Sequence, residues 1–78
     1  MARPLYEIAA EIRKTWKNIS PYAEPRLEAM ESLNSIDDNY YFESGKEQVL
    51  YFLANASTWR GEDARRIKAE LKQMAGLK

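Results

Sequence analysis

The middle of the chain contains its most informative stretch, Ser44-Gly45-Lys46-Glu47-Gln48-Val49-Leu50-Tyr51-Phe52-Leu53-Ala54-Asn55-Ala56. Its first four residues match a capping box, in which Ser44 and Glu47 each accept a hydrogen bond from the other's backbone N–H at a helix start. The apolar residues that follow cover more than half of a helix circumference. A β-strand over 49–52 is the competing interpretation, because this run contains β-forming residues. The capping box and the length of the run favour a central helix.

Two helices are predicted before this stretch. Apolar residues recur at the i, i+3, i+4, i+7 spacing of a helix from Pro4 to about Asn18, and Pro21 disfavours helical geometry in the residue before it. A second helix is expected over about Tyr22–Asn34. Pro25 lacks a backbone N–H, so either the first turn of this helix is irregular or the helix starts near Ala23.

A fourth helix is predicted after the central one. Ser57, Thr58 or Gly61 can cap its start, and Gly76 is a plausible stop. Residues 35–44 are expected to be irregular, and Ser35 with Asp38 has the spacing to cap one helical turn there.

Together these segments predict an all-α fold, a compact bundle of three to four short helices. A chain of 78 residues has room for one core, so residues 1–78 are expected to form a single domain. The core is expected to be built from the apolar residues that recur at helical spacing. They are Leu5, Ile8, Ile12, Trp16, Leu27, Met30, Leu33, Val49, Phe52, Leu53, Ile67 and Leu71.

The sequence contains neither cysteine nor histidine. The usual general base near neutral pH and the commonest transition-metal ligands are therefore missing. We expect a protein that is not an enzyme and that has no catalytic residue, metal, cofactor or small-molecule substrate. The longest apolar run, 49–54, is far shorter than the ~20 residues that span a bilayer, and the chain starts without an apolar signal region. These features and the lack of disulfides favour a soluble, cytoplasmic protein.

The acidic segment that starts at Asp37 invites comparison with a helix–loop–helix calcium site. The sixth position of that pattern needs glycine and holds Phe42. The twelfth needs a bidentate glutamate and holds Gln48. The pattern fails at both positions, so Asp37 and Asp38 are expected only to cap or solvate a loop.

Three adjacent aromatic residues, Tyr40, Tyr41 and Phe42, lie in the irregular segment. Neighbouring side chains leave the backbone in different directions, so one or two of the three should be exposed. Tyr40 and Tyr41, together with Trp59 and Arg60, are therefore predicted to border a surface for a second copy or a host protein. Two alternatives stay open: the segment folds back and buries its aromatics, and Trp59 closes the core.

The charges are unevenly distributed along a chain of zero net charge. Residues 24–47 hold seven acidic and two basic residues, whereas 59–78 hold six basic and three acidic ones. Separate acidic and basic faces would suit electrostatic steering of a partner, but ordinary solvated helices produce such blocks too. The last helix is the candidate for nucleic-acid binding, because five basic residues lie within 13 positions: Arg60, Arg65, Arg66, Lys68 and Lys72. Nucleic acid is the secondary hypothesis, because a neutral chain starts at an electrostatic disadvantage.

A resemblance covers about residues 5–74. Residues 44–61 (SGKEQVLYFLANASTWRG), followed by Ala64-Arg65 and Lys68-Ala69-Glu70-Leu71-Lys72 and preceded by Ser35-Ile36-Asp37-Asp38, resemble small uncharacterised proteins encoded by bacteriophages and prophages, particularly of actinobacteria. The resemblance carries no catalytic or binding residue to transfer. It implies an accessory phage protein in a bacterial cytoplasm, of a kind that binds host or phage macromolecules. We therefore expect protein–protein interaction, through self-association or a host protein, without contact with a membrane.

Overall fold

The computed structural model describes residues 3–76, which contain four helices and one small sheet. In chain order the elements are α1 (Leu5–Thr15), α2 (Glu24–Met30), β1 (Asn39–Tyr40), β2 (Glu43–Ser44), α3 (Gly45–Ala54) and α4 (Glu62–Met74). The prediction of a mostly helical, compact fold is confirmed, since about 55% of the described residues are helical. The all-α prediction is corrected by the two-stranded sheet, which occupies part of the segment that was expected to be irregular.

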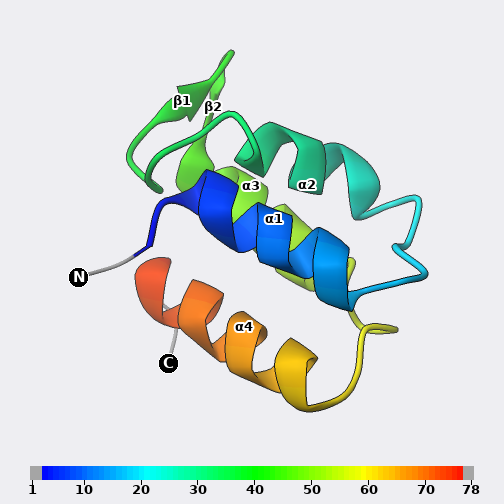
Figure 1. Ribbon diagram of the computed structural model, residues 1–78. Coiled ribbons are helices and arrows are strands. Elements are labelled where there is room, and N and C mark those ends of the chain that lie inside the picture. The colour runs from blue at the N-terminus through cyan, green and yellow to red at the C-terminus, as the bar shows by residue number, and fades with distance from the viewer. Residues whose placement is uncertain (1–2, 77–78) are drawn as a thin grey trace.

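The four helices form a ring around one core. Helix α1 packs against α2 and α4, and α3 packs against the same two helices. In Figure 1, α1 crosses the front of the molecule between α2 above and α4 below, and α3 lies behind it. The β1–β2 hairpin projects at the upper left, on the side away from α4. The hairpin and α4 therefore present separate surfaces.

The core contains every residue that the helical spacing predicted, although Leu53 is only half-buried at its edge. It contains an aromatic cluster of Trp16, Phe52 and Trp59. The Trp16 and Trp59 rings stack with centroids 5.3 Å apart, and Phe52 meets each of them edge-on. These rings join the residue after α1, the last turn of α3 and the loop before α4.

Helix α1 ends at Thr15, three residues before the predicted end near Asn18. Trp16 is the cap residue and has extended geometry, with φ −103° and ψ 98°. This change of direction lets the Trp16 ring enter the core, where only 5% of the residue is exposed. Burial of the indole thus ends the helix earlier than the spacing alone indicates.

Helix α2 is much shorter than the predicted Tyr22–Asn34. Pro25 lies in its first turn, where a missing N–H has no consequence, so the helix starts at Glu24. The chain leaves the helix after Met30, and the carbonyls of Leu33 and Asn34 then accept hydrogen bonds from the N–H groups of Tyr6 and Leu5, at 2.9 and 3.0 Å. These donors at the start of α1 have no partner within their own helix. A tertiary contact therefore uses the residues that were expected to extend α2.

Helix α3 confirms the prediction made from its first residues. Ser44 Oγ accepts from the Glu47 N–H at 3.2 Å, and the Glu47 carboxylate accepts from the Ser44 N–H at 3.5 Å. The strand interpretation of residues 49–52 is wrong. Gly61, one of three predicted caps, precedes α4 with φ 114°, and Gly76 follows it with φ 81°. Both values lie where glycine is favoured.

Candidate functional site

The hairpin separates the three adjacent aromatics. Asn39 pairs with Ser44 and Tyr40 with Glu43, so Tyr41 and Phe42 form a two-residue turn. Phe42 is 102% exposed and Tyr41 83%, whereas Tyr40 is half-buried and packs against the core. The prediction that one or two of the three are exposed is confirmed. The tip of the hairpin, defined as Tyr41 and Phe42, carries the two most exposed large apolar side chains described.

The backbone of the tip is strained as well as exposed. Tyr41 has φ 59°, a left-handed conformation, and is the one described non-glycine residue with positive φ. Two-residue hairpin turns favour such values because they match the twist of the strands, and asparagine or glycine normally supplies them. An aromatic residue in this conformation costs of order 1–3 kcal/mol. The Tyr41 ring meets the Tyr40 ring edge-on at 4.7 Å, a contact that favours this arrangement.

The base of the hairpin is fixed to the helices by backbone hydrogen bonds. The Gly45 N–H donates to the Asp38 carbonyl at 2.6 Å, and the Lys46 N–H donates to the Ile36 carbonyl at 2.9 Å. The Asp38 carboxylate accepts from the N–H groups of Asn34 and Ser35, at 2.9 and 3.3 Å. Ser35 and Asp38 therefore stabilise a turn, and the single helical turn expected here is absent from the described segment.

A polar cluster supports the hairpin from the side of α2. Arg26 donates to Glu43 and to the buried Gln48, each at 3.1 Å, and Gln48 donates to Glu43 at 2.9 Å. The hydrogen bond from Gln48, followed by the charge of Arg26, lowers the pKa of Glu43. The Arg26 guanidinium also lies 4.4 Å from the centroid of the Tyr51 ring. Glu43 lies on β2, so this cluster ties the strand to α2 and α3.

Trp59 lies in the core and Arg60 on the surface. Only 4% of Trp59 is exposed, and its ring stacks on Trp16. The interpretation in which Trp59 closes the core is the one observed, and its placement on an interaction surface is corrected. Arg60 is exposed, so it stays a candidate contact residue. The turn after α3 directs residue 59 inward and residue 60 outward, and stacking on Trp16 holds Trp59 in the core.

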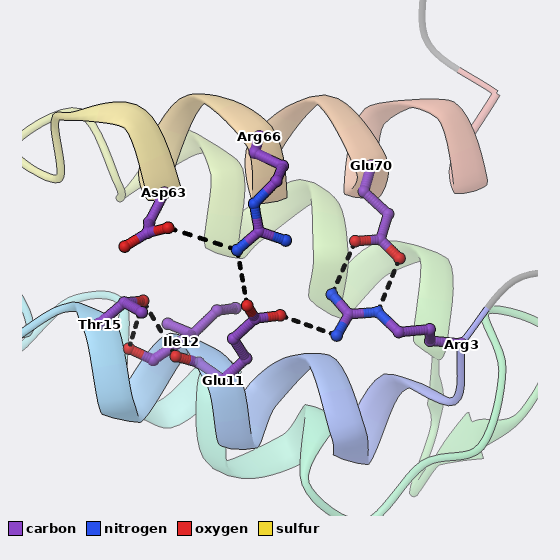
Figure 2. A network of polar contacts seen from close by, with 7 residues as sticks. All are labelled: Arg3, Glu11, Ile12, Thr15, Asp63, Arg66 and Glu70. Atoms are coloured by element: carbon purple, nitrogen blue, oxygen red, sulfur yellow. Dashed lines mark hydrogen bonds and ion pairs between the residues drawn. The ribbon is translucent and has the colours of Figure 1, made fainter.

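The charges of α4 are divided between its two flanks. The flank that faces α1 carries Asp63, Arg66 and Glu70, and Figure 2 shows them joined to two residues before and within α1. Arg66 donates to Glu11 at 2.6 Å, and Arg3 binds Glu70 through two hydrogen bonds of 3.0 and 2.7 Å. Arg3 also forms an ion pair with Glu11 at 2.7 Å. Arg66, predicted to contact nucleic acid, is thus engaged within the fold.

The opposite flank of α4 carries Arg65, Lys68 and Lys72, one above another at i, i+3 and i+7. Lys68 donates to the Trp59 carbonyl at 2.6 Å. Its pKa is lowered by burial first and then by the charges of Lys72 and Arg60. Together with Arg60, which precedes the helix, these residues form what we call the cationic flank: Arg60, Arg65, Lys68 and Lys72. Within residues 3–76, no acidic side chain forms an ion pair with any of the four.

A shallow hollow of about 350 Å³ lies at the start of the cationic flank. Its lining consists of Trp59, Arg60, Gly61, Ala64, Arg65 and Lys68. The structure thus brings together Arg60, Arg65 and Lys68 and sets Tyr40 and Tyr41 apart on the hairpin. Lys72 was recognised from the sequence as part of the basic run of the last helix. Phe42 was recognised as one of three adjacent aromatics, but the sequence did not show which of the three is exposed.

Glu11→Gln is expected to lower the free energy of unfolding near neutral pH by about 1 kcal/mol or less, because the network is partly solvated. Hydrogen bonds from Arg66 and then Arg3 lower the pKa of Glu11 below its ordinary 4.5. The stabilisation is therefore present above about pH 4.5 and lost as pH falls through the lower value of the folded state. Urea unfolding of wild type and Glu11→Gln, measured near neutral pH and again in acid, checks this pH dependence of the stability difference.

The matched control for this change is Glu7→Gln, on the exposed side of the same helix. It removes the same charge without breaking a described ion pair. The difference between wild type and Glu11→Gln should shrink in acid. A difference that stays constant with pH would show that the carboxylate of Glu11 does not stabilise the contact between α1 and α4.

Neither a metal cluster nor a membrane span is found in the part of the chain that is described. No group of three or more acidic residues within it could hold a metal ion. None of its helices is long and apolar enough to cross a membrane. No protein-family model, no curated protein and no solved structure matches the chain, so the interpretation of its surfaces depends on their chemistry alone.

Proposed function

We propose that this chain is a non-enzymatic accessory protein that binds a protein partner through the aromatic tip of its hairpin. The observation that carries the proposal is the full exposure of Phe42 next to the strained, exposed Tyr41. Burying a phenylalanine side chain is worth about 1.5–3 kcal/mol. An exposed pair of aromatics on a projecting turn therefore fits an apolar pocket on a partner, where such residues act as anchors.

Preorganisation of the tip supports the proposal. The hydrogen bonds of Gly45 and Lys46 to the preceding turn, together with the Arg26–Glu43–Gln48 cluster, hold both strands of the hairpin. A segment that is already ordered loses less conformational entropy when it binds. Strain at Tyr41 is also typical of residues that a fold holds in place for contact with a ligand.

A non-enzymatic role agrees with the titratable groups. Histidine and cysteine are absent from the sequence. Arginine or glutamine neighbours lower the pKa of Glu11, Glu24 and Glu43, and each carboxylate is held in its charged form. A general acid near neutral pH needs the opposite shift. The resemblance to phage-encoded proteins adds the proposed setting, a bacterial host cytoplasm.

The test is photo-crosslinking from the tip. A photoreactive phenylalanine analogue at position 42 is expected to crosslink to one predominant protein in a bacterial lysate, or to a second copy of the chain. Tyr22, 75% exposed and distant in sequence, is the matched position for the same analogue. Sedimentation velocity of the purified chain then distinguishes self-association from binding of another protein.

The double variant Tyr41→Ser with Phe42→Ser is expected to lose the complex and to keep its melting temperature, because neither ring is buried. Tyr22→Ser, which removes one exposed ring elsewhere, should keep both. Tyr40→Ser should instead lower stability, because Tyr40 packs on the core. Equal crosslinking from positions 42 and 22, or a complex that survives the double variant, would refute the proposal.

A further inference from the structure

Four cations without acidic partners follow one flank of α4. Arg60 precedes the helix, and Arg65, Lys68 and Lys72 recur along one side of it over about two turns, or ~10 Å at 1.5 Å per residue. Arg60, Arg65 and Lys72 are exposed, and Lys68 is half-buried between them and the Trp59 carbonyl. Like charges at such spacing repel one another, so the cluster lowers the stability of the free protein.

The acidic residues of α4 do not relieve this repulsion, because they lie elsewhere on the helix. Asp63 and Glu70 face α1, where they bind Arg66 and Arg3. Helical spacing places Glu62 on the outer edge, between the two flanks. The lowered pKa of Lys68 has the charges of Lys72 and Arg60 among its causes. A bound anion would remove both the repulsion and part of that shift.

We infer that the cationic flank binds the phosphodiester backbone of a nucleic-acid strand. Phosphate groups are regularly spaced anions, and arginine and lysine side chains supply most of the contacts to them. The hollow at Arg60, Arg65 and Lys68 would receive one phosphate, and Lys72 would contact another further along the helix. This inference does not depend on the proposed role of the hairpin, which lies on a different surface.

The geometry favours contact with one backbone over insertion of α4 into a groove. A recognition helix in the major groove lies between two phosphate strands and presents its outer edge to the bases. Here the second flank is neutralised by ion pairs to α1, and the outer edge carries Glu62, Ala69 and Gln73. A carboxylate at that edge, for which no ion pair is described, would approach the bases. The flank therefore binds without reading sequence.

Base stacking is also excluded at the hollow. Trp59 lines it but is only 4% exposed, since its ring faces Trp16. Single-strand binding proteins with strong affinity use exposed aromatics as stacking platforms. Without them, affinity here is electrostatic, modest and steeply dependent on salt.

The experiment measures fluorescence anisotropy of labelled oligonucleotides of one length, single-stranded and duplex, with the full chain. Release of counterions from two phosphates gives a slope of log K against log salt of about −1.4 for a single strand and −1.8 for a duplex. Affinity should fall about 7-fold to 12-fold between ~50 and ~200 mM salt. Whichever of the single-stranded and duplex oligonucleotides binds more tightly identifies the form of nucleic acid that the flank prefers. Oligonucleotides of different sequence should bind with similar affinity.

The test variant is Arg60→Gln with Arg65→Gln and Lys72→Gln, which leaves Lys68 and its contact with Trp59 intact. Its affinity at low salt should fall at least tenfold, and the slope should approach that of a single phosphate contact, about −0.7 to −0.9. The matched control is Lys14→Gln with Lys17→Gln and Lys46→Gln, which removes the same charge from exposed lysines outside the flank. It should change affinity by less than about threefold and should melt like wild type. The test variant should melt at the wild-type temperature or above it, because the repulsion within the flank is relieved.

Three outcomes would overturn the inference. The first is no binding of either oligonucleotide at ~50 mM salt, where electrostatic contacts are strongest. The second is an equal loss of affinity in the two triple variants, which would mean that only net charge matters. The third is equal or tighter binding of polyglutamate, which would assign the flank to an acidic protein.

Discussion

Trp59→Ala is expected to lower the free energy of unfolding by about 3–5 kcal/mol. The residue is 4% exposed, and its indole stacks on Trp16 and meets Phe52 edge-on. Removing it leaves a cavity where α1, α3 and the loop before α4 converge, and two aromatic partners lose their contacts. A domain of this length has a stability of only about 4–12 kcal/mol, so a large fraction of the variant should be unfolded at ambient temperature.

Urea unfolding followed by circular dichroism measures this effect. Arg60→Ala is the matched control, because it changes the next residue, which is exposed and not part of the core. It should shift the unfolding free energy by less than about 0.5 kcal/mol. If Trp59→Ala unfolds too readily to measure, Trp59→Phe keeps an aromatic ring and should lose less stability. An unchanged midpoint in both variants would show that Trp59 is not part of the core.

Gly45→Ala is expected to destabilise the protein by about 1–3 kcal/mol, the range for overpacking a well-filled site. Gly45 is buried, and a Cβ built on it would lie 2.6 Å from the Ser35 carbonyl oxygen and 3.0 Å from the Ile36 Cα. Both are backbone atoms, so the turn at 35–38 would have to move. The hydrogen bond from the Gly45 N–H to the Asp38 carbonyl would be distorted with it.

Lys46→Ala is the matched control, because the side chain of Lys46 is exposed and alanine is a good helix former. It should leave stability within about 0.5 kcal/mol of wild type. Thermal unfolding measures both variants. A Gly45→Ala protein as stable as Lys46→Ala would mean that the turn and α3 are not held in close contact. Because this turn supports the hairpin, Gly45→Ala should also weaken any complex formed through the tip.

The two candidate surfaces could be predicted from the sequence to different degrees. The residues of the cationic flank could be read from the sequence, since Arg60, Arg65, Lys68 and Lys72 all belong to one basic run of 13 residues. Arg66 stays a predicted contact, but the structure pairs it with Glu11, which is 55 residues away in the chain. No local pattern reports such a pair. The exposed tip was only partly predicted, because the turn that directs Tyr40 inward and Phe42 outward needs the pairing of β1 with β2.

The sequence by itself determined the four helices, the capping box at Ser44 and the membership of the core, because these depend on spacing within a single segment. The tertiary structure alone decided where α2 ends, that Trp59 is buried and which charges stay free. Each of these depends on groups brought together from distant segments. The carbonyls of Leu33 and Asn34 accept hydrogen bonds from N–H groups at the start of α1. Trp59 stacks on Trp16, and Arg66 binds Glu11. Unpaired backbone donors, apolar surface and charge find partners across the fold, and these contacts outweigh local preference.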